Sequence, residues 1–315
     1  MTSTRPMKNR IQSLKREFDT LRKGKDSLLS MIDEVEIPEG VYNSNAIENS
    51  TLSLEETEQI LLEQMLSRNV SIREVYEARN LARVMEYKRA RAKDSELSET
   101  LILGFHQMLM GGIDDSIAGR FRQKGEYVRV GTHIAPAPEH VERMMENLLI
   151  DYVSDLDSYF LDKIALFHLA FEYIHPFCDG NGRLGRVIMN FQLLQLGLPR
   201  IIIRNSEKER YYQAFREYGH NASTKAMENI VFLGLVESLH KRLSYLKGVE
   251  IIRLSDYIRQ NGLSAPAVTN AARRQSIPAF REKGVWKIGR AFDHPGQDRP
   301  RSTPTDQGLG SSDQV

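Results

Sequence analysis

The chain has 315 residues, of which 41% are hydrophobic, so it can bury a sizeable core and form roughly two domains. Its formal net charge is +1, which excludes a whole-chain field that would favour nucleic acid or an anionic membrane. Cys178 is the only cysteine and excludes an intrachain disulfide, which fits a reducing compartment. Residues 1–18 lack the apolar core of a signal peptide, and no later segment is apolar over the length of a membrane span. We therefore expect a cytoplasmic protein with no membrane partner.

The N-terminal region, residues 1–95, is predicted to be helical. Residues 8–35 carry apolar side chains at near-helical spacing, and Pro38 and Gly40 then predict a break. Three Ser-x-x-Glu capping boxes predict the starts of later helices. The boxes are Ser53 with Glu56, Ser71 with Glu74, and Ser206 with Glu209.

A second region, residues 96–247, is also predicted to be mostly helical. Its amphipathic segments are 97–110, 139–156, 160–176, 181–196, 207–218 and 224–247. Residues 119–141 differ, because polar and apolar side chains alternate before Gly131 and two prolines follow. This pattern predicts a short β-hairpin and an extended loop. We therefore expect an all-α fold with one small β element.

Residues 248–291 are predicted to form a compact module, in which residues 263–289 have the order helix, turn, helix and end in a β-wing around Val285 to Ile288. This order favours a winged helix–turn–helix, whose basic residues within 263–290 would contact DNA phosphates. A docking or structural module is the alternative, because Pro278 interrupts the candidate recognition segment. Residues 292–315 are rich in Pro, Gly, Ser and Asp and are predicted to be disordered.

The stretch HPFCDGNGRLGR, residues 175–186, contains a predicted anion site. Gly180 and Gly182 let the backbone approach a ligand and expose amide groups at the start of a helix, where phosphate often binds. Arg183 and Arg186 share a face of that helix. Two cations at a helix N-terminus oppose its dipole, so their presence indicates a polyanionic ligand. Solvated surface charges are the alternative.

His175 and Asp179 add a base and a metal ligand to this stretch. Asp179 is the kind of hard oxygen ligand that holds Mg²⁺ beside phosphates. His175, with an ordinary pKa of about 6.5, can take a proton from a hydroxyl at neutral pH. The combination predicts phosphoryl or nucleotidyl transfer. A transition-metal site is a rival, because four potential ligands share one stripe: His168, Glu172, His175 and Asp179.

These twelve residues resemble the signature of the Fic-domain family, His-x-Phe-x-(Asp/Glu)-Gly-Asn-Gly-Arg-x-x-Arg, at every specified position. The resemblance covers about residues 40–245. It implies a Fic-type helical core with a β-hairpin flap, and transfer of AMP from ATP to a Ser, Thr or Tyr hydroxyl of a target protein. Self-modification is one form of that activity. Candidate partners are ATP, the target protein, DNA through 263–290, and a second copy in a homodimer.

The resemblance also implies residue roles. His175 would deprotonate the hydroxyl, Phe177 would anchor the loop, and Asp179 would hold Mg²⁺. The implied nucleotide-binding residues are Gly180, Asn181, Gly182, Arg183, Arg186, Tyr211 and Tyr212. Arg183 would bind the α/β region and Arg186 the γ-phosphate, whereas the two tyrosines would line the adenine pocket or belong to the core. The flap would pair with the target by strand addition through Tyr127, Val128, Arg129, Val130, Gly131 and Thr132.

Ser44-x-x-x-Glu48-Asn49 resembles the inhibitory motif of the same family, on a helix at about 43–50. Ser44 and Glu48 are four residues apart and share a helical face, so Glu48 can offer a carboxylate to Arg186. That contact would occupy the γ-phosphate clamp and hold the enzyme inactive. Some members use this glutamate to remove AMP again, and the motif leaves that option open.

Other side chains near the motif are expected to be structural. Cys178 is interpreted as a small filler, His168 and His106 as core residues, and Glu172 as a polar support. Two further functions remain as alternatives: transfer of another phosphate-containing group, and a nucleotide-sensing DNA-binding regulator.

Overall fold

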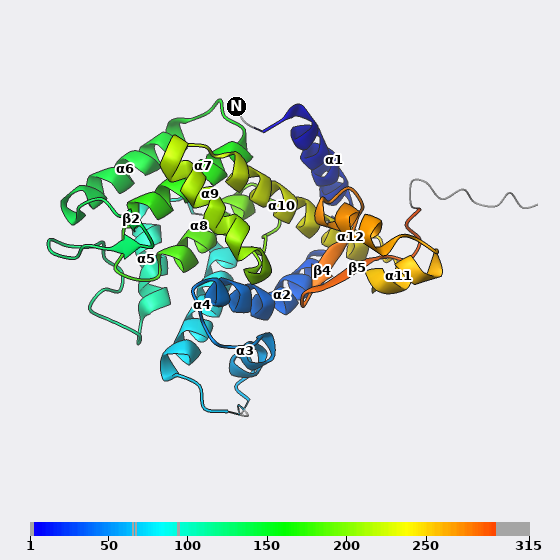
Figure 1. Cartoon of the computed structure of the whole chain (residues 1–315), viewed down its shortest axis with the longest axis horizontal. Helices are drawn as coiled ribbons and strands as arrows, with labels where there is room; N and C mark the ends of the chain where they lie inside the picture. The colour runs from blue at the N-terminus through cyan, green and yellow to red at the C-terminus, as the bar shows by residue number, and fades with distance from the viewer. Residues whose placement is uncertain (1–2, 65, 67, 93–94, 294–315) are drawn as a thin grey trace, which may run out of the picture.

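The structure is a computed structural model that describes residues 3–64, 66, 68–92 and 95–293. Helices make up most of it, in agreement with the predicted fold class (Figure 1). The first helices are α1 (Arg5–Leu21), α2 (Asp26–Ile47), α3 (Leu54–Leu61), α4 (Ile72–Arg91) and α5 (Glu99–Met110). After the hairpin come α6 (Pro138–Ser154), α7 (Phe160–Ile174), α8 (Asn181–Gln195), the 3₁₀ turn η1 (Asn205–Glu207), α9 (Lys208–Asn221) and α10 (Lys225–Leu246). Within the described residues, no helix combines the length and apolarity needed to cross a membrane.

Helices α7 and α8 form the centre of the molecule, because most of their side chains are buried. Phe171 of α7 and Phe191 of α8 belong to one hydrophobic cluster with α4 and α5. Leu169 and Leu193 of the same two helices belong to a second cluster with α1, α9 and α10. The loop that joins α7 to α8 is therefore held between two firmly packed helices.

The N-terminal helices divide at a different place from the predicted one. The break falls at Arg22–Lys25, where Gly24 has a φ of +70°, and α2 then runs through Pro38. The prediction was wrong because Pro38 removes only one helical N–H donor. Glu36 and Glu39, on either side of it, are buried and paired with cations of other segments, which holds α2 in its helical path.

One of the three predicted capping boxes is confirmed. Ser53 and Glu56 exchange both hydrogen bonds at the start of α3. Glu74, the glutamate of the second box, instead accepts a hydrogen bond from the backbone N–H of Thr51 at 2.6 Å. The third box, at Ser206, is wrong because η1 occupies its place and α9 begins two residues later.

The predicted β-hairpin is present. Strands β1 (Arg129–Val130) and β2 (His133–Ile134) pair antiparallel, with Val130 opposite His133. Two residues connect them, and the first, Gly131, has a φ of +58°. Two-residue hairpin turns need such a conformation, which glycine adopts without strain.

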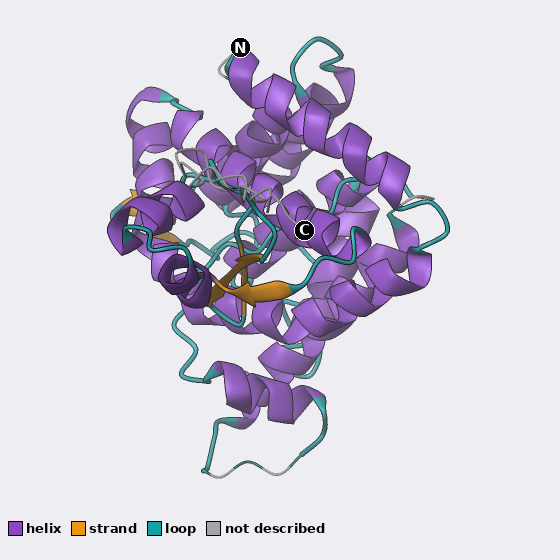
Figure 2. Cartoon of the chain, turned by 90° about the vertical axis from the view of Figure 1, so that its right-hand side faces the viewer, coloured by secondary structure: helices purple, strands orange, loops and turns teal. Residues whose placement is uncertain are grey.

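The C-terminal module contains β3 (Ile251–Arg253), α11 (Leu254–Gln260), α12 (Ala265–Arg273), β4 (Phe280–Glu282) and β5 (Val285–Gly289). Its sheet has the order β3-β5-β4, and its own small core includes Tyr257 and Ile288. Of the elements predicted within 263–289, the first helix (α12) and the β-wing are present. The predicted second helix is wrong, because Phe280–Glu282 forms strand β4 and pairs with β5. Figure 2 shows the strands of the molecule as a small part of a helical body. Residues 294–315 of the predicted tail lie outside the described residues.

Buried polar contacts fix the module to α10 and α2. Glu237 of α10 accepts hydrogen bonds from the backbone N–H and the guanidinium of Arg281. The backbone N–H groups of Lys283 and Gly284 donate to Glu39 of α2 at 3.0 and 3.1 Å. The module is therefore bonded to α2, the helix that also carries Ser44.

Candidate active site

The loop between α7 and α8 begins with a backbone reversal at His175. His175 has a φ of +49°, its N–H still bonds to the carbonyl of Phe171, and Pro176 prevents another helical turn. A positive φ is costly for a side chain other than glycine. Arg122, which is buried, stabilises it by donating to the carbonyl of His175 at 2.8 Å. Arg122 was not predicted as a site residue, because its segment has the sequence pattern of a loop.

Phe177 and His106 anchor the middle of the loop. Phe177 is fully buried, and its ring stacks on His106 with 3.8 Å between centroids. His106 Nδ1 accepts from the Gly119 N–H at 3.0 Å, so its proton lies on Nε2 and is donated to the Asp179 carbonyl at 3.0 Å. Burial lowers the pKa of His106 to about 4, so the ring is neutral at pH 7. His106 is thus structural, as expected, and it positions the loop.

Asn181 closes the loop with both groups of its side-chain amide. Its Oδ1 accepts from the Phe177 N–H at 2.9 Å and its Nδ2 donates to the Phe177 carbonyl at 2.8 Å. The predicted contact of Asn181 with phosphate stays a prediction, because this side chain is engaged with the backbone. Burial raises the pKa of the Cys178 thiol to about 11, which supports its interpretation as a filler.

The N-terminus of α8 has the form of an anion site. Gly180, with a φ of +80°, precedes the helix, and no described side chain caps its first turn. The amide groups of that turn lack helical acceptors and suit a phosphate. A Cβ atom at position 180 would lie 3.2 Å from the sulfur of Met110. A side chain at this position would be crowded by Met110 and strained by the positive φ.

Asp179 lies beside the anion site among arginines. Arg183 reaches its Oδ1 at 3.2 Å, and Arg73 of α4 pairs with its Oδ2. Burial opposes ionisation of Asp179, but Arg183, the Gly180 N–H and Arg73 together hold its pKa below the usual value. Arg183 also pairs with Glu77 of α4 at 3.1 Å. Arg73 and Glu77 were not predicted, because isolated charges on a surface helix carry no signal in the sequence.

The donor set fits Mg²⁺ better than a transition metal. One ionised carboxylate beside an anion site suits Mg²⁺, whose remaining ligands are phosphate oxygens and water. Across the described residues, no group of three His, Cys, Asp or Glu side chains could hold a metal ion. His168 of the rival stripe instead bonds to the Tyr211 hydroxyl at 2.6 Å. Asp179 is therefore the candidate ligand for Mg²⁺.

His175 has the properties of a neutral base. Its side chain is 15% exposed, and its Nδ1 lies 3.8 Å from Glu172 Oε2. Burial lowers the pKa of His175 to about 4, against a weaker opposing hydrogen bond with the Glu172 backbone. The imidazole is neutral at pH 7 and can accept a proton from a hydroxyl that enters the site.

Arg186 is occupied by the end of α2. Its Nε donates to Ser44 Oγ at 2.9 Å, and its Nη2 donates to the Ser44 carbonyl at 2.8 Å and to Glu48 Oε1 at 2.9 Å. Figure 1 shows this end of α2 (blue) near α8 and α9. A Cβ on Gly182 would lie 2.1 Å from Glu48 Oε1, so the glycine leaves the space that the carboxylate fills. The predicted pairing of Glu48 with Arg186 is thus present in the structure.

Asn49 ends α2 with a φ of +68°. Lys208 donates to Asn49 Oδ1 at 2.7 Å, and the Tyr212 hydroxyl donates to the Ile47 carbonyl at 3.0 Å. Both partners belong to α9. The start of α9 therefore holds residues 47–49 in place beside Arg186.

Buried side chains of α7 and α9 pack around Arg186. Tyr211 is almost fully buried and bonded to His168, so the structure places it in the core, and its role at adenine stays a prediction. Burial and the nearby Glu48 raise the pKa of Glu172 to about 8, so its carboxyl is largely protonated at pH 7. A Cβ on Gly185 would lie 2.4 Å from Glu172 Oε1. Gly185 was not identified from the sequence, because the motif leaves its position unspecified.

The hairpin lies next to the loop. His133 bonds to the Tyr173 carbonyl of α7 at 2.9 Å and ties β2 to the helix that carries His175. Tyr127, Val130 and Ile134 are exposed by 65%, 45% and 72%. The six predicted flap residues, 127–132, therefore form an accessible edge close to the candidate base.

Comparison with known proteins finds the family that the motif at 175–186 resembles. The model of the Fic/DOC family matches residues 96–193. A Nematostella vectensis protein named Protein adenylyltransferase Fic is 35% identical over 185 residues, which cover 57% of this chain and 43% of that protein. A Culex quinquefasciatus protein of the same name is 30% identical over 211 residues, which cover 62% of this chain and 42% of that protein. The chain thus spans less than half the length of these curated relatives.

Solved structures of Fic-domain proteins share the fold of this chain. A Fic domain containing signaling protein from Bacteroides thetaiotaomicron is 26% identical, with a TM-score of 0.69, over 76% of this chain and 97% of that one. A Fic family protein from Desulfovibrio desulfuricans shares the fold over 94% of this chain and 99% of that one, at 21% identity and a TM-score of 0.61. This chain therefore carries a Fic/DOC family domain, and the loop between α7 and α8 lies within it.

Proposed function

We propose that this chain is a protein adenylyltransferase that transfers AMP from ATP to a Ser, Thr or Tyr hydroxyl of a target protein. The observation that carries the proposal is the loop at 175–186, which joins a neutral histidine at the end of α7 to the uncapped N-terminus of α8. The names of the relatives support the same activity.

In this reaction His175 accepts the proton of the target hydroxyl. The hydroxyl oxygen forms a bond to the α-phosphorus, the bond from that phosphorus to the bridging oxygen breaks, and pyrophosphate leaves. Asp179 would hold Mg²⁺, which would neutralise charge on the phosphates. The first-turn amides of α8 and Arg183 would bind the α- and β-phosphates, and Arg186 would bind the γ-phosphate.

The contacts of Arg186 support a proposal of autoinhibition. Glu48 and Ser44 use the guanidinium edge that a γ-phosphate needs. We propose that ATP binds poorly or in an unproductive position until Glu48 moves away. The flap would align the target by pairing its exposed edge with an extended segment, which brings the hydroxyl to His175. Cytoplasmic localisation, self-modification, removal of AMP by Glu48, DNA contact through 263–290 and a homodimer stay predictions.

Two labelled nucleotides test the proposal. The Glu48→Gly variant is incubated with a cell lysate, Mg²⁺, and ATP that is labelled on either the α- or the γ-phosphate. Compared with lysate that lacks the variant, we expect additional protein-bound label from α-labelled ATP only, and no additional label with the Glu48→Gly/His175→Ala double variant. Label from γ-labelled ATP only would overturn AMP transfer, and label that persists without His175 would overturn its role as base.

A further inference from the structure

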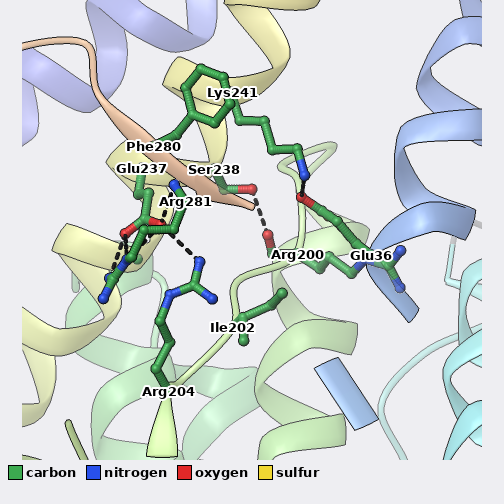
Figure 3. Close-up of a pocket in the computed structure, with 10 residues that line it drawn as sticks. Glu36, Arg200, Ile202, Arg204, Glu237, Ser238, Lys241, Phe280 and Arg281 are labelled. Atoms are coloured by element: carbon green, nitrogen blue, oxygen red, sulfur yellow. Dashed lines mark hydrogen bonds and ion pairs between the residues drawn. The ribbon is translucent and has the colours of Figure 1, made fainter. Parts of the chain in front are cut away.

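A cleft of about 520 Å³ lies between the helical core and the C-terminal module. Its walls come from residues 201–207, α9 and α10 on one side and from α12 and β5 on the other. None of its lining residues belongs to the loop at 175–186 or to the inhibitory segment. This volume is typical of small-molecule sites, about 300–1,000 Å³. The adjoining cavity in Figure 3 is about 20 Å³, which is room for about one water molecule.

One part of the cleft is apolar. Ile202, Ile230 and Leu233 line it from the core, and Trp286 lines it from the module. The guanidinium of Arg281 lies over the Trp286 ring, 4.6 Å from its centroid, and holds the indole in place. The cleft therefore has a preformed apolar surface that suits a flat or aliphatic body.

The acidic groups of the cleft are already neutralised. Figure 3 shows the Glu237 carboxylate between the guanidinium groups of Arg204 and Arg281. Arg281 also pairs with Glu207 at 2.7 Å. Arg204 and Arg281, two of the four arginines that line the cleft, are therefore already paired with these carboxylates.

The other two arginines are available to a ligand. Arg210 of α9 and Arg273 of α12 line the cleft and are exposed, and within the described part of the chain neither has a hydrogen-bond or ion-pair partner. The Nε of Arg204, a residue that is only 6% exposed, is also buried without a partner. Unpaired guanidinium groups bind carboxylates and phosphates through paired hydrogen bonds. The cleft thus offers a surplus of positive charge beside an apolar surface.

We propose that this cleft binds a small organic anion, in which a carboxylate or phosphate group is joined to an apolar or aromatic body. Arg210 and Arg273 bind the anionic group from opposite walls, and Trp286 contacts the body. Because the two arginines come from α9 and α12, the ligand bridges the core and the module. This site is separate from the proposed transfer activity and does not depend on it.

Trp286 provides a specific test, because it is the only tryptophan in the chain. The full chain is titrated with anilinonaphthalene sulfonate, an aromatic anion that accepts energy from tryptophan. Quenching of Trp286 is recorded for the wild type and for the variant Arg210→Ala/Arg273→Ala. The matched control is Arg143→Ala/Arg274→Ala, which removes two exposed arginines that do not line the cleft. Thermal melts verify that all three proteins are folded.

We expect saturable quenching with one site, weakened at least about tenfold in the Arg210/Arg273 variant and unchanged in the control. Two results would overturn the proposal. The first is quenching that does not saturate in the wild type. The second is equal affinity in both double variants, which would mean that the probe binds by apolar contact alone.

Discussion

The contact between Glu48 and Arg186 predicts a measurable gain in nucleotide affinity for Glu48→Gln. Glutamine keeps the length of the side chain but removes the charge that pairs with the guanidinium at 2.9 Å. Because Glu48 is 36% exposed and Arg186 is 6% exposed, solvent screens the pair only in part. Pairs of this kind contribute about 1–2 kcal/mol. Removing the competing charge should therefore strengthen ATP binding about 5- to 30-fold.

The assay is calorimetric titration with Mg²⁺ and ATP in a His175→Ala background, which prevents turnover. Arg186 keeps both bonds to Ser44, so the midpoint of thermal unfolding should change by less than about 3 °C. Glu142→Gln, at an exposed position on α6, is the matched control. A dissociation constant for Glu48→Gln within twofold of the control would refute the reasoning.

Three predictions concern stability. Burial lowers the pKa of four histidines to between about 3 and 4 in the folded protein, so these side chains bind protons when the protein unfolds below about pH 6.5. The pKa of Glu172 is raised in the folded protein, so unfolding releases one proton from its carboxyl group. The net uptake should lower the free energy of unfolding as pH falls from 6.5 to 4.5, and a melting temperature that stays flat in this window would contradict it. Gly185→Ala should destabilise by about 1–3 kcal/mol in urea unfolding, because the new Cβ meets Glu172 at 2.4 Å, whereas a gain in stability would show that the surrounding side chains relax freely. Phe177→Ala should cost about 3–5 kcal/mol in the same assay, and a loss below 1 kcal/mol would mean that the ring is no anchor. The four histidines are His106, His168, His175 and His240.

Much of the helical core could be predicted because its helices are amphipathic and end at recognisable residues. All six helices predicted over 97–247 have bounds within three residues of the observed ones. The hairpin was predictable because Gly131 stands where the turn needs a positive φ. Pro38 misled the prediction, because long-range ion pairs on its helix stabilise what the local sequence disfavours.

The candidate site was predictable where its residues are consecutive in the chain. His175, Asp179 and the two glycines follow one another, so the motif contains their geometry. Arg122 and His106 were not assigned to the loop, because they lie 53 and 73 residues from their partners in it, and contacts over such a separation leave no local pattern in the sequence. Glu48 was identified only because its own segment carries a second motif.

Charged residues far from any motif were the least predictable. The sequence shows Glu39, Arg204 and Glu237 as ordinary charges of surface helices and loops. In the structure they are buried and paired across three segments, which joins α2 to the C-terminal module. Such networks depend on tertiary packing, so only the fold shows them.

Intact-mass spectrometry of purified Glu48→Gly after incubation with Mg²⁺ and ATP, beside the Glu48→Gly/His175→Ala double variant, tests the central claim most directly. With the single variant, we expect a gain of the mass of AMP on the variant itself or on a target protein added to it. With the double variant, we expect no gain of mass on either protein. A gain of phosphate in place of AMP, or a gain of AMP that the double variant retains, would contradict the central claim.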